Sequence, residues 1–139
     1  MCLKIDTSIK LRKTNKNGYH IGYKSIYLDN TSSYQNCQLK NGVNTSNRKN
    51  KEFTPFEKNT NLIESGYHIF LDIKDALEEC NHWSNNTWLG RPEKVIRVYF
   101  KPEDIVSTGF FYNSRKGTSK NVVVMKMDIK SFSKIKKGY

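Results

Sequence analysis

One histidine and the tyrosine before it stand where side chains could contact a charged ligand. His68 follows Tyr67 in a short apolar run, and Asp72 then opens a segment with the apolar spacing of a helix. Backbone amides and the helix dipole at a helix N-terminus attract negative charge, so this position favours a phosphate or nucleotide contact for His68. The alternative is a histidine whose ring is satisfied inside the core.

The cysteines give no pattern of a metal site or of a disulfide framework. Cys2, Cys37 and Cys80 are odd in number and widely spaced, which favours a reducing compartment. Cys80 and His82 are too close together to share a tetrahedral zinc site comfortably, and no second pair completes a ligand set. The sequence also has no apolar run of membrane-span length and no signal-like start. We therefore predict no metal, no cofactor, no membrane contact and a cytoplasmic location.

Basic residues gather toward the two ends of the chain. The net charge is +11, with ten Lys/Arg and two acids in residues 1–51 and eight Lys/Arg and one acid in residues 105–139, whereas acids outnumber bases between them. If the two ends meet in the fold, they form one basic face that would bind nucleic acid or an acidic protein. The alternative is a solvated surface in a chain rich in lysine. The candidate binding residues are Lys10, Arg12, Lys13, Lys16, Lys24, Arg115, Lys116 and Lys120, together with His68.

The elements that position these residues are mostly strands. Alternation of apolar and polar residues, or a continuous apolar run, predicts strands over 2–5, 19–28, 67–71, 95–100, 105–112 and 122–129. One helix is predicted from Asp72 to the region of Cys80–His82, with Ile73, Ala76, Leu77 and Cys80 on its apolar face. Strands without alternating helices exclude a doubly wound parallel fold.

The predicted fold class is therefore α+β, a small and mainly antiparallel twisted sheet with one principal helix and a long polar loop. The length of 139 residues fits a single domain over 1–139. Residues 29–61 are predicted to be the long polar loop or an insertion, and residues 130–139 a basic tail.

Four short blocks, in this order, resemble a set of small, largely uncharacterised phage and prophage proteins. The blocks are Met1-Cys2-Leu3, Gly22-Tyr23-Lys24, Gly66-Tyr67-His68-Ile69-Phe70 and Asp104-Ile105-Val106. The resemblance implies a viral accessory protein that acts in the host cytoplasm. Together with the basic ends, it gives our main expectation: binding of nucleic acid or a nucleoprotein complex, in a role consistent with action against host defence.

A more remote resemblance is to compact ADP-ribosyltransferase-like folds, and it implies a nucleotide-binding enzyme. His20 and the Tyr67-His68 pair match two of that family's motif positions. The late glutamate that the family usually carries is missing, because Asp128 is the only acid after Asp104. We therefore expect binding rather than catalysis, with His20, Tyr67 and His68 as the site of the enzymatic alternative. A scaffold or virion component is the third class.

Overall fold

The computed structural model describes residues 3–6, 8–31, 38–46, 62–63, 66–83, 94–113 and 117–135. Its elements are β1 (Leu3–Ile5), β2 (His20–Ile26), β3 (Gly42–Thr45), β4 (Leu62–Ile63), β5 (Tyr67–Phe70), α2 (Ile73–Trp83), β6 (Lys94–Phe100), the short 3-10 helix η1 (Pro102–Asp104), β7 (Ile105–Asn113), β8 (Gly117–Val124) and β9 (Lys126–Ile129). The strands form one sheet in the order β3-β9-β6-β2-β5-β8-β7-β1-β4, with every strand pair antiparallel. Within the described residues this confirms an α+β fold that is mostly antiparallel sheet.

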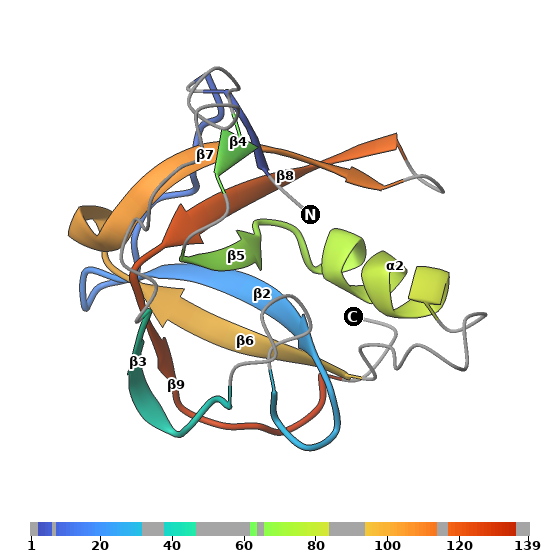
Figure 1. Cartoon of the computed structure of the whole chain (residues 1–139). Helices are drawn as coiled ribbons and strands as arrows, with labels where there is room; N and C mark the ends of the chain where they lie inside the picture. Colours follow the sequence, from blue (N-terminus) through green and yellow to red (C-terminus); the bar gives the residue numbers. More distant parts are fainter. Residues whose placement is uncertain are drawn as a thin grey trace.

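A bend at Met125 connects two distant parts of this sheet. β8 pairs with β5 and β7, whereas β9, which starts directly after Met125, pairs with β6 and β3. The backbone of Met125 is held from both sides, because its N–H donates to the Asp104 carbonyl and its carbonyl accepts from the Ser46 N–H. Since β8 and β9 are joined by one residue but separated by β6, β2 and β5, the sheet curves round on itself (Figure 1).

The inside of the curved sheet holds the main core. Fully or almost fully buried apolar side chains meet there from β2, β5, β6, β8 and β9, and Leu39 joins them from the segment before β3. Gly22 lies where β2 passes closest to β5, because a Cβ at this position would overlap the Ile69 side chain and come within 3.1 Å of Phe100. A side chain at residue 22 would therefore push these two strands apart.

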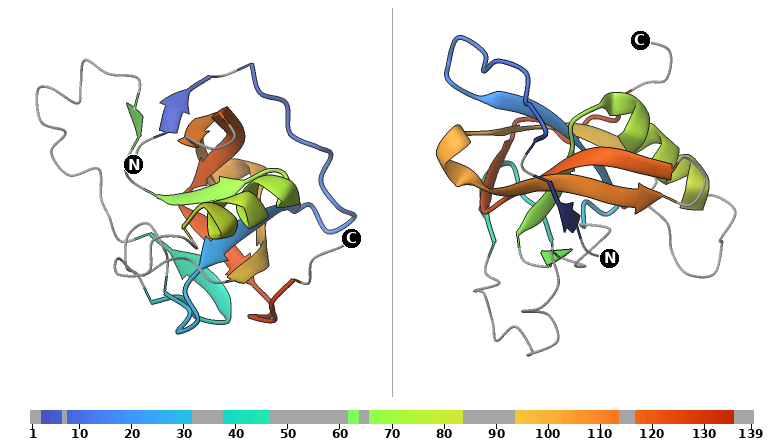
Figure 2. Two further views of the ribbon diagram at one scale, coloured as in Figure 1. Left: turned by 90° about the vertical axis from the view of Figure 1, so that its right-hand side faces the viewer. Right: turned by 90° about the horizontal axis from the view of Figure 1, so that it is seen from above.

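The other face of the sheet carries α2, as Figures 1 and 2 show. Ala76 is fully buried there against Phe70, Val95 and Val123, and the half-buried Leu77 and Cys80 pack beside them. The predicted apolar helix face is thus the face that packs on the sheet. Asp75 is buried in the first turn of α2, and its N–H donates to the Asp72 carbonyl.

The structure differs from the sequence prediction within residues 122–129. The single strand predicted there is broken at Met125, so Val122 and Val124 share the core with Met127 and Ile129. The region 29–61 contains the strand β3, while its residues 32–37 and 47–61 lie outside the described residues.

The predicted basic tail contacts the sheet in its described part. The Ile135 N–H donates to the Val95 carbonyl, and the Ile135 side chain packs against the cluster under α2. Lys94 donates to the Phe132 carbonyl at 3.1 Å and lies over the Phe132 ring. Residues 131–135 are therefore attached to the end of β6 that lies next to α2.

Candidate functional site

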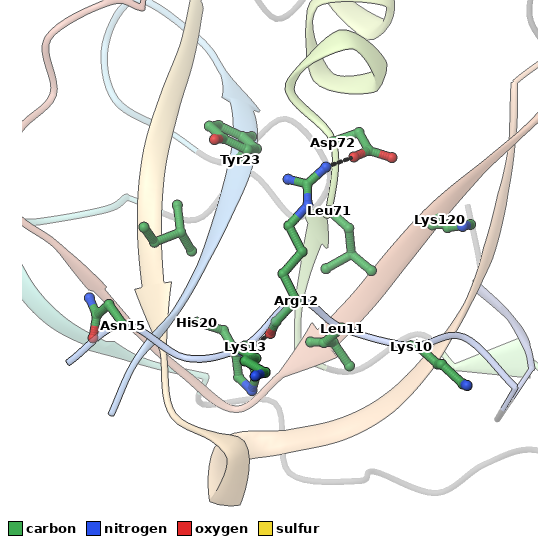
Figure 3. Close-up of a pocket in the computed structure, with 11 residues that line it drawn as sticks. Lys10, Leu11, Arg12, Lys13, Asn15, His20, Tyr23, Leu71, Asp72 and Lys120 are labelled. Carbon is green, nitrogen blue, oxygen red and sulfur yellow. Dashed lines mark hydrogen bonds and ion pairs between the residues drawn. The ribbon is translucent and has the colours of Figure 1, made fainter. Parts of the chain in front are cut away.

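A pocket of about 290 Å³ opens where α2 begins, beside the segment that leads into β2 (Figure 3). Residues 10–13 and Asn15 form one wall, β2 contributes His20, Ile21 and Tyr23, and Leu71 and Asp72 close the side nearest the helix. A second hollow of about 450 Å³ shares Arg12, Tyr23, Asp72 and Lys120 with the first. The shared residues show that the two hollows are adjoining parts of one concave surface, which we call the basic pocket.

A tight turn places the wall of residues 10–15 against β2. The Asn15 carboxamide oxygen accepts from the N–H groups of Asn17 and Tyr19, both at 3.0 Å, and the Asn15 N–H donates to the Tyr19 carbonyl. Gly18 has a φ of +84°, which a glycine adopts without strain. The chain therefore reverses over Asn15–Tyr19 and returns as β2 alongside the residues it has just left.

His20 fixes this wall at the first residue of β2. Its Nδ1 lies 3.0 Å from the Arg12 carbonyl oxygen. Because a carbonyl oxygen only accepts, Nδ1 carries the hydrogen and donates it. The ring also packs on Phe100, with the two ring centres 5.3 Å apart. His20 is therefore a lining residue of the pocket whose orientation is set by two contacts.

Five cationic side chains line the basic pocket, and they come from distant parts of the sequence. Lys10, Arg12 and Lys13 lie on its wall, Lys74 lines the second hollow, and Lys120 approaches from β8. The Arg12 side chain runs between Tyr23 and Leu71 toward Asp72 (Figure 3), and its Nη2 donates to Asp72 Oδ1 at 2.7 Å. The fold therefore places basic residues that are more than one hundred positions apart around the same concave surface.

The remaining predicted binding residues do not line this pocket. Lys16 is exposed in the turn that precedes β2. Lys24 is only 3% exposed, and its Nζ donates to the His68 carbonyl at 2.9 Å inside the sheet. Arg115 and Lys116 lie outside the described residues. Of the candidate cations that the structure describes, the pocket thus brings together Lys10, Arg12, Lys13 and Lys120.

His68 is placed in the protein interior. It is 7% exposed on β5, opposite Val123, on the face of the sheet that α2 covers. Burial, with a smaller contribution from the charge of Lys24, lowers the pKa of His68 from 6.5 to about 3. The ring is therefore neutral at physiological pH, and the second interpretation of His68, a histidine within the core, is the one that this environment supports.

The three residues of the enzymatic alternative do not share a pocket. Tyr67 is 3% exposed and points into the main core, while His68 points to the opposite face of β5. Only His20 of the three lines the basic pocket.

Tyr23 and Asp72 line both hollows and were not among the predicted binding residues. In the sequence, Tyr23 belongs to the Gly22-Tyr23-Lys24 block and Asp72 opens the predicted helix. In the structure the Asp72 carboxylate accepts from Arg12, sixty residues earlier in the chain. Side chains alternate between the two faces of β2, so Tyr23 lies on the same face as Ile21. This alternation could have identified Tyr23 as a lining residue. No local signal in the sequence pairs Asp72 with Arg12.

Other kinds of site have less support. Among the described residues, no group of three or more His, Cys, Asp or Glu is placed to hold a metal ion. No described helix is long and apolar enough to cross a membrane.

Comparison with models of protein families, with curated proteins and with solved structures finds no match for this chain.

Proposed function

We propose that this protein binds nucleic acid through the basic pocket. The observation that carries the proposal is the convergence of Lys10, Arg12, Lys13 and Lys120 on one concave surface. Lysine and arginine neutralise phosphates and release condensed counterions, which is the main source of affinity for nucleic-acid backbones. A pocket of this size accommodates one nucleotide unit of a longer strand better than it accommodates the flat surface of a folded protein.

The rings beside the cations favour nucleic acid over an acidic protein. Tyr23 is half-buried and His20 is held by Arg12 and Phe100, so both present ring surface at low cost in side-chain entropy. Aromatic rings next to a cationic groove are typical of single-strand binding, where stacking on a base contributes roughly 1–3 kcal/mol. The Asp and Glu side chains of an acidic peptide have no flat ring system to use this part of the lining.

The proposal is tested by the salt dependence of binding. A labelled single-stranded oligonucleotide is titrated with the protein at several salt concentrations, and Kd is followed by fluorescence anisotropy. The double variant Lys10→Gln, Lys13→Gln should bind more weakly and reduce the slope of log K against log salt by about 1.4, because each lost phosphate contact removes about 0.7 for single strands. The control variant Lys126→Gln, Lys134→Gln removes the same charge from exposed residues that do not line the pocket.

Equal effects of the two double variants would contradict a localised site. That result would show that only the overall charge of the protein attracts the strand. Binding of an acidic peptide with no binding of the oligonucleotide would instead favour an acidic protein partner.

We propose further that the protein is a phage or viral accessory protein that acts in the host cytoplasm, in a role against host defence. This part rests on the ordered sequence blocks that resemble small phage proteins, and the basic pocket supplies the kind of surface such a protein would use on a nucleic acid or a nucleoprotein complex. An affinity pull-down from a bacterial lysate, with and without nuclease, tests it: a partner that is lost on nuclease treatment supports a bridging nucleic acid.

An ADP-ribosyltransferase-like enzyme is the alternative function. His20 in the pocket favours a bound nucleotide, whereas the interior positions of Tyr67 and His68 leave its other two motif residues away from that pocket. Stabilisation of the protein by NAD in a thermal-denaturation experiment would support the enzyme. Its absence, combined with salt-sensitive oligonucleotide binding, would support the binder.

A further inference from the structure

The basic pocket is lined by two acidic side chains, the buried Asp75 and the more exposed Asp72, which a site for bare anions would not need. Asp72 lines both adjoining hollows, and its side chain remains 43% exposed although it pairs with Arg12. A fixed negative charge at this position repels a phosphate group, so it weakens the attraction that Lys10, Lys13 and Lys120 provide. Asp72 therefore does not help to attract anions, and its contacts indicate another role.

The local fold does not explain the Asp72 side chain. The first turn of α2 uses the backbone carbonyl of Asp72, which accepts from the N–H groups of Asp75 and Ala76. The carboxylate itself is directed toward Arg12 (Figure 3). Ion pairs as exposed as this one, with 78% and 43% of the two side chains accessible, contribute little to stability. The ion pair with Arg12 thus holds the Asp72 carboxylate, which accepts hydrogen bonds, at a defined point of the pocket.

A carboxylate accepts hydrogen bonds and donates none. Arg12 occupies Oδ1, which leaves further acceptor sites on the two oxygens for a ligand that carries N–H or O–H groups. A nucleotide unit offers both chemistries, since its phosphate is anionic and its ribose hydroxyls and base N–H groups are donors. Carboxylates bind ribose hydroxyls and exocyclic base amines in this manner in other recognition sites.

We propose that Asp72 makes the basic pocket selective for a nucleotide unit, with the phosphate on the lysines and a ribose hydroxyl or base N–H donating to the Asp72 carboxylate. The inference rests on the proposed nucleic-acid binding and adds a requirement to it. A polyanion without hydrogen-bond donors, however highly charged, meets the repulsion of Asp72 and gains nothing from its acceptor oxygens.

The test compares two ligands by isothermal titration calorimetry on the full chain. One is a short single-stranded RNA, and the other is inorganic polyphosphate, which at neutral pH is an acceptor without donors. In Asp72→Asn the polyphosphate should bind about fivefold more tightly, as expected from removing one like charge at about 4 Å in water. The RNA should bind more weakly, because the neutral carboxamide oxygen is a weaker acceptor than the carboxylate and the new NH2 group cannot accept. The ratio of the two Kd values should therefore change by about tenfold or more relative to the unmodified protein.

Two further variants keep the result interpretable. Asp72→Glu retains the carboxylate and should retain preference for RNA. Glu103→Gln removes one negative charge from an exposed residue of η1 that does not line the pocket, and it should leave the Kd ratio unchanged. Circular dichroism confirms that each variant is folded before titration.

Separate RNA and DNA strands of each single base identify the donor. A preference for RNA over DNA that is lost in Asp72→Asn assigns the bond to the ribose 2′-hydroxyl, and a base preference lost in that variant assigns it to the base. If Asp72→Asn tightens RNA and polyphosphate by the same factor, the inference is overturned while nucleic-acid binding stands. If the unmodified protein binds neither ligand, both proposals fail.

Discussion

Acidification below pH 6.5 should destabilise this protein through His68. The ring is buried between β5 and α2, and burial lowers its pKa from 6.5 to about 3. In the unfolded chain the same ring takes up a proton below pH 6.5, while in the folded protein it stays neutral down to about pH 3. The unfolded state therefore binds more protons in this window. The contribution of His68 is fully present above pH 6.5 and is lost as the pH falls toward 3.

The size of the effect follows from the two pKa values. Each unit of pH below 6.5 costs about 1.4 kcal/mol, so lowering the pH from about 7 to about 5 should reduce the free energy of unfolding by about 2 kcal/mol. With an unfolding entropy of about 2.1 cal/mol/K per residue, a chain of 139 residues should lose about 7 °C in Tm. Urea denaturation at a series of pH values, followed by circular dichroism, measures the first quantity, and calorimetry measures the second.

The matched control is His68→Leu, which fills the site with an apolar side chain that does not titrate. Its absolute stability can differ from that of the unmodified protein, but its free energy of unfolding should change much less over the same pH range. All other titratable groups are present in both proteins, so the comparison isolates the effect of residue 68. Equal losses in the two proteins between about pH 7 and about pH 5 would refute the assignment to His68.

Two substitutions test the packing of the sheet and the hydrogen bonds next to β3. Gly22→Ala should lower the free energy of unfolding by about 1–3 kcal/mol in urea denaturation, because the new Cβ overlaps Ile69. When Gly22→Ala is combined with Ile69→Ala, the two losses should be less than additive. Strict additivity would contradict the close approach of residue 22 to Ile69. Asn44→Ala should cost about 1–3 kcal/mol, since the buried carboxamide bonds both the N–H and the carbonyl of Lys40. A change within error of zero for Asn44→Ala would mean that water replaces both bonds.

The sequence pattern predicts a strand or helix well where the burial of apolar side chains alone determines it. The run from Val95 to Phe100 is apolar at almost every position and becomes β6 between β2 and β9. The spacing of Ala76, Leu77 and Cys80 predicts α2 and the face it buries. In both cases the burial of apolar side chains determines the element and its orientation, and that information lies within a few neighbouring residues.

The bend at Met125 depends on contacts that no local pattern contains. The segment around it has no glycine or proline, so its sequence is typical of one straight strand. The Asp104 carbonyl and the Ser46 N–H, both distant in sequence, hold the Met125 backbone in place of strand partners. The alternation of faces then restarts after the bend, which brings Met127 into the core.

The sequence indicates the positive charge of the basic pocket but only some of the residues that line it. Convergence of the two basic ends is found for residues 10–13 and Lys120. The burial of Lys24 follows from its place on β2, because it is two residues before Ile26 and faces the same side of the strand as that core residue. His68 is buried because α2 covers its face of the sheet, and this is a tertiary contact.

The continuity of β8 with β9 has a consequence for how the molecule comes apart. Detaching β9 from β3 and β6 would pull on the same backbone that carries the hydrogen bonds to β5 and β7. Partial opening around β9 is therefore transmitted through one residue to β8, and opening around β8 is transmitted to β9. Amide hydrogens on both sides of Met125 should exchange with deuterated solvent in a single concerted step, and Lys120 should keep its place beside residues 10–13 until that step occurs.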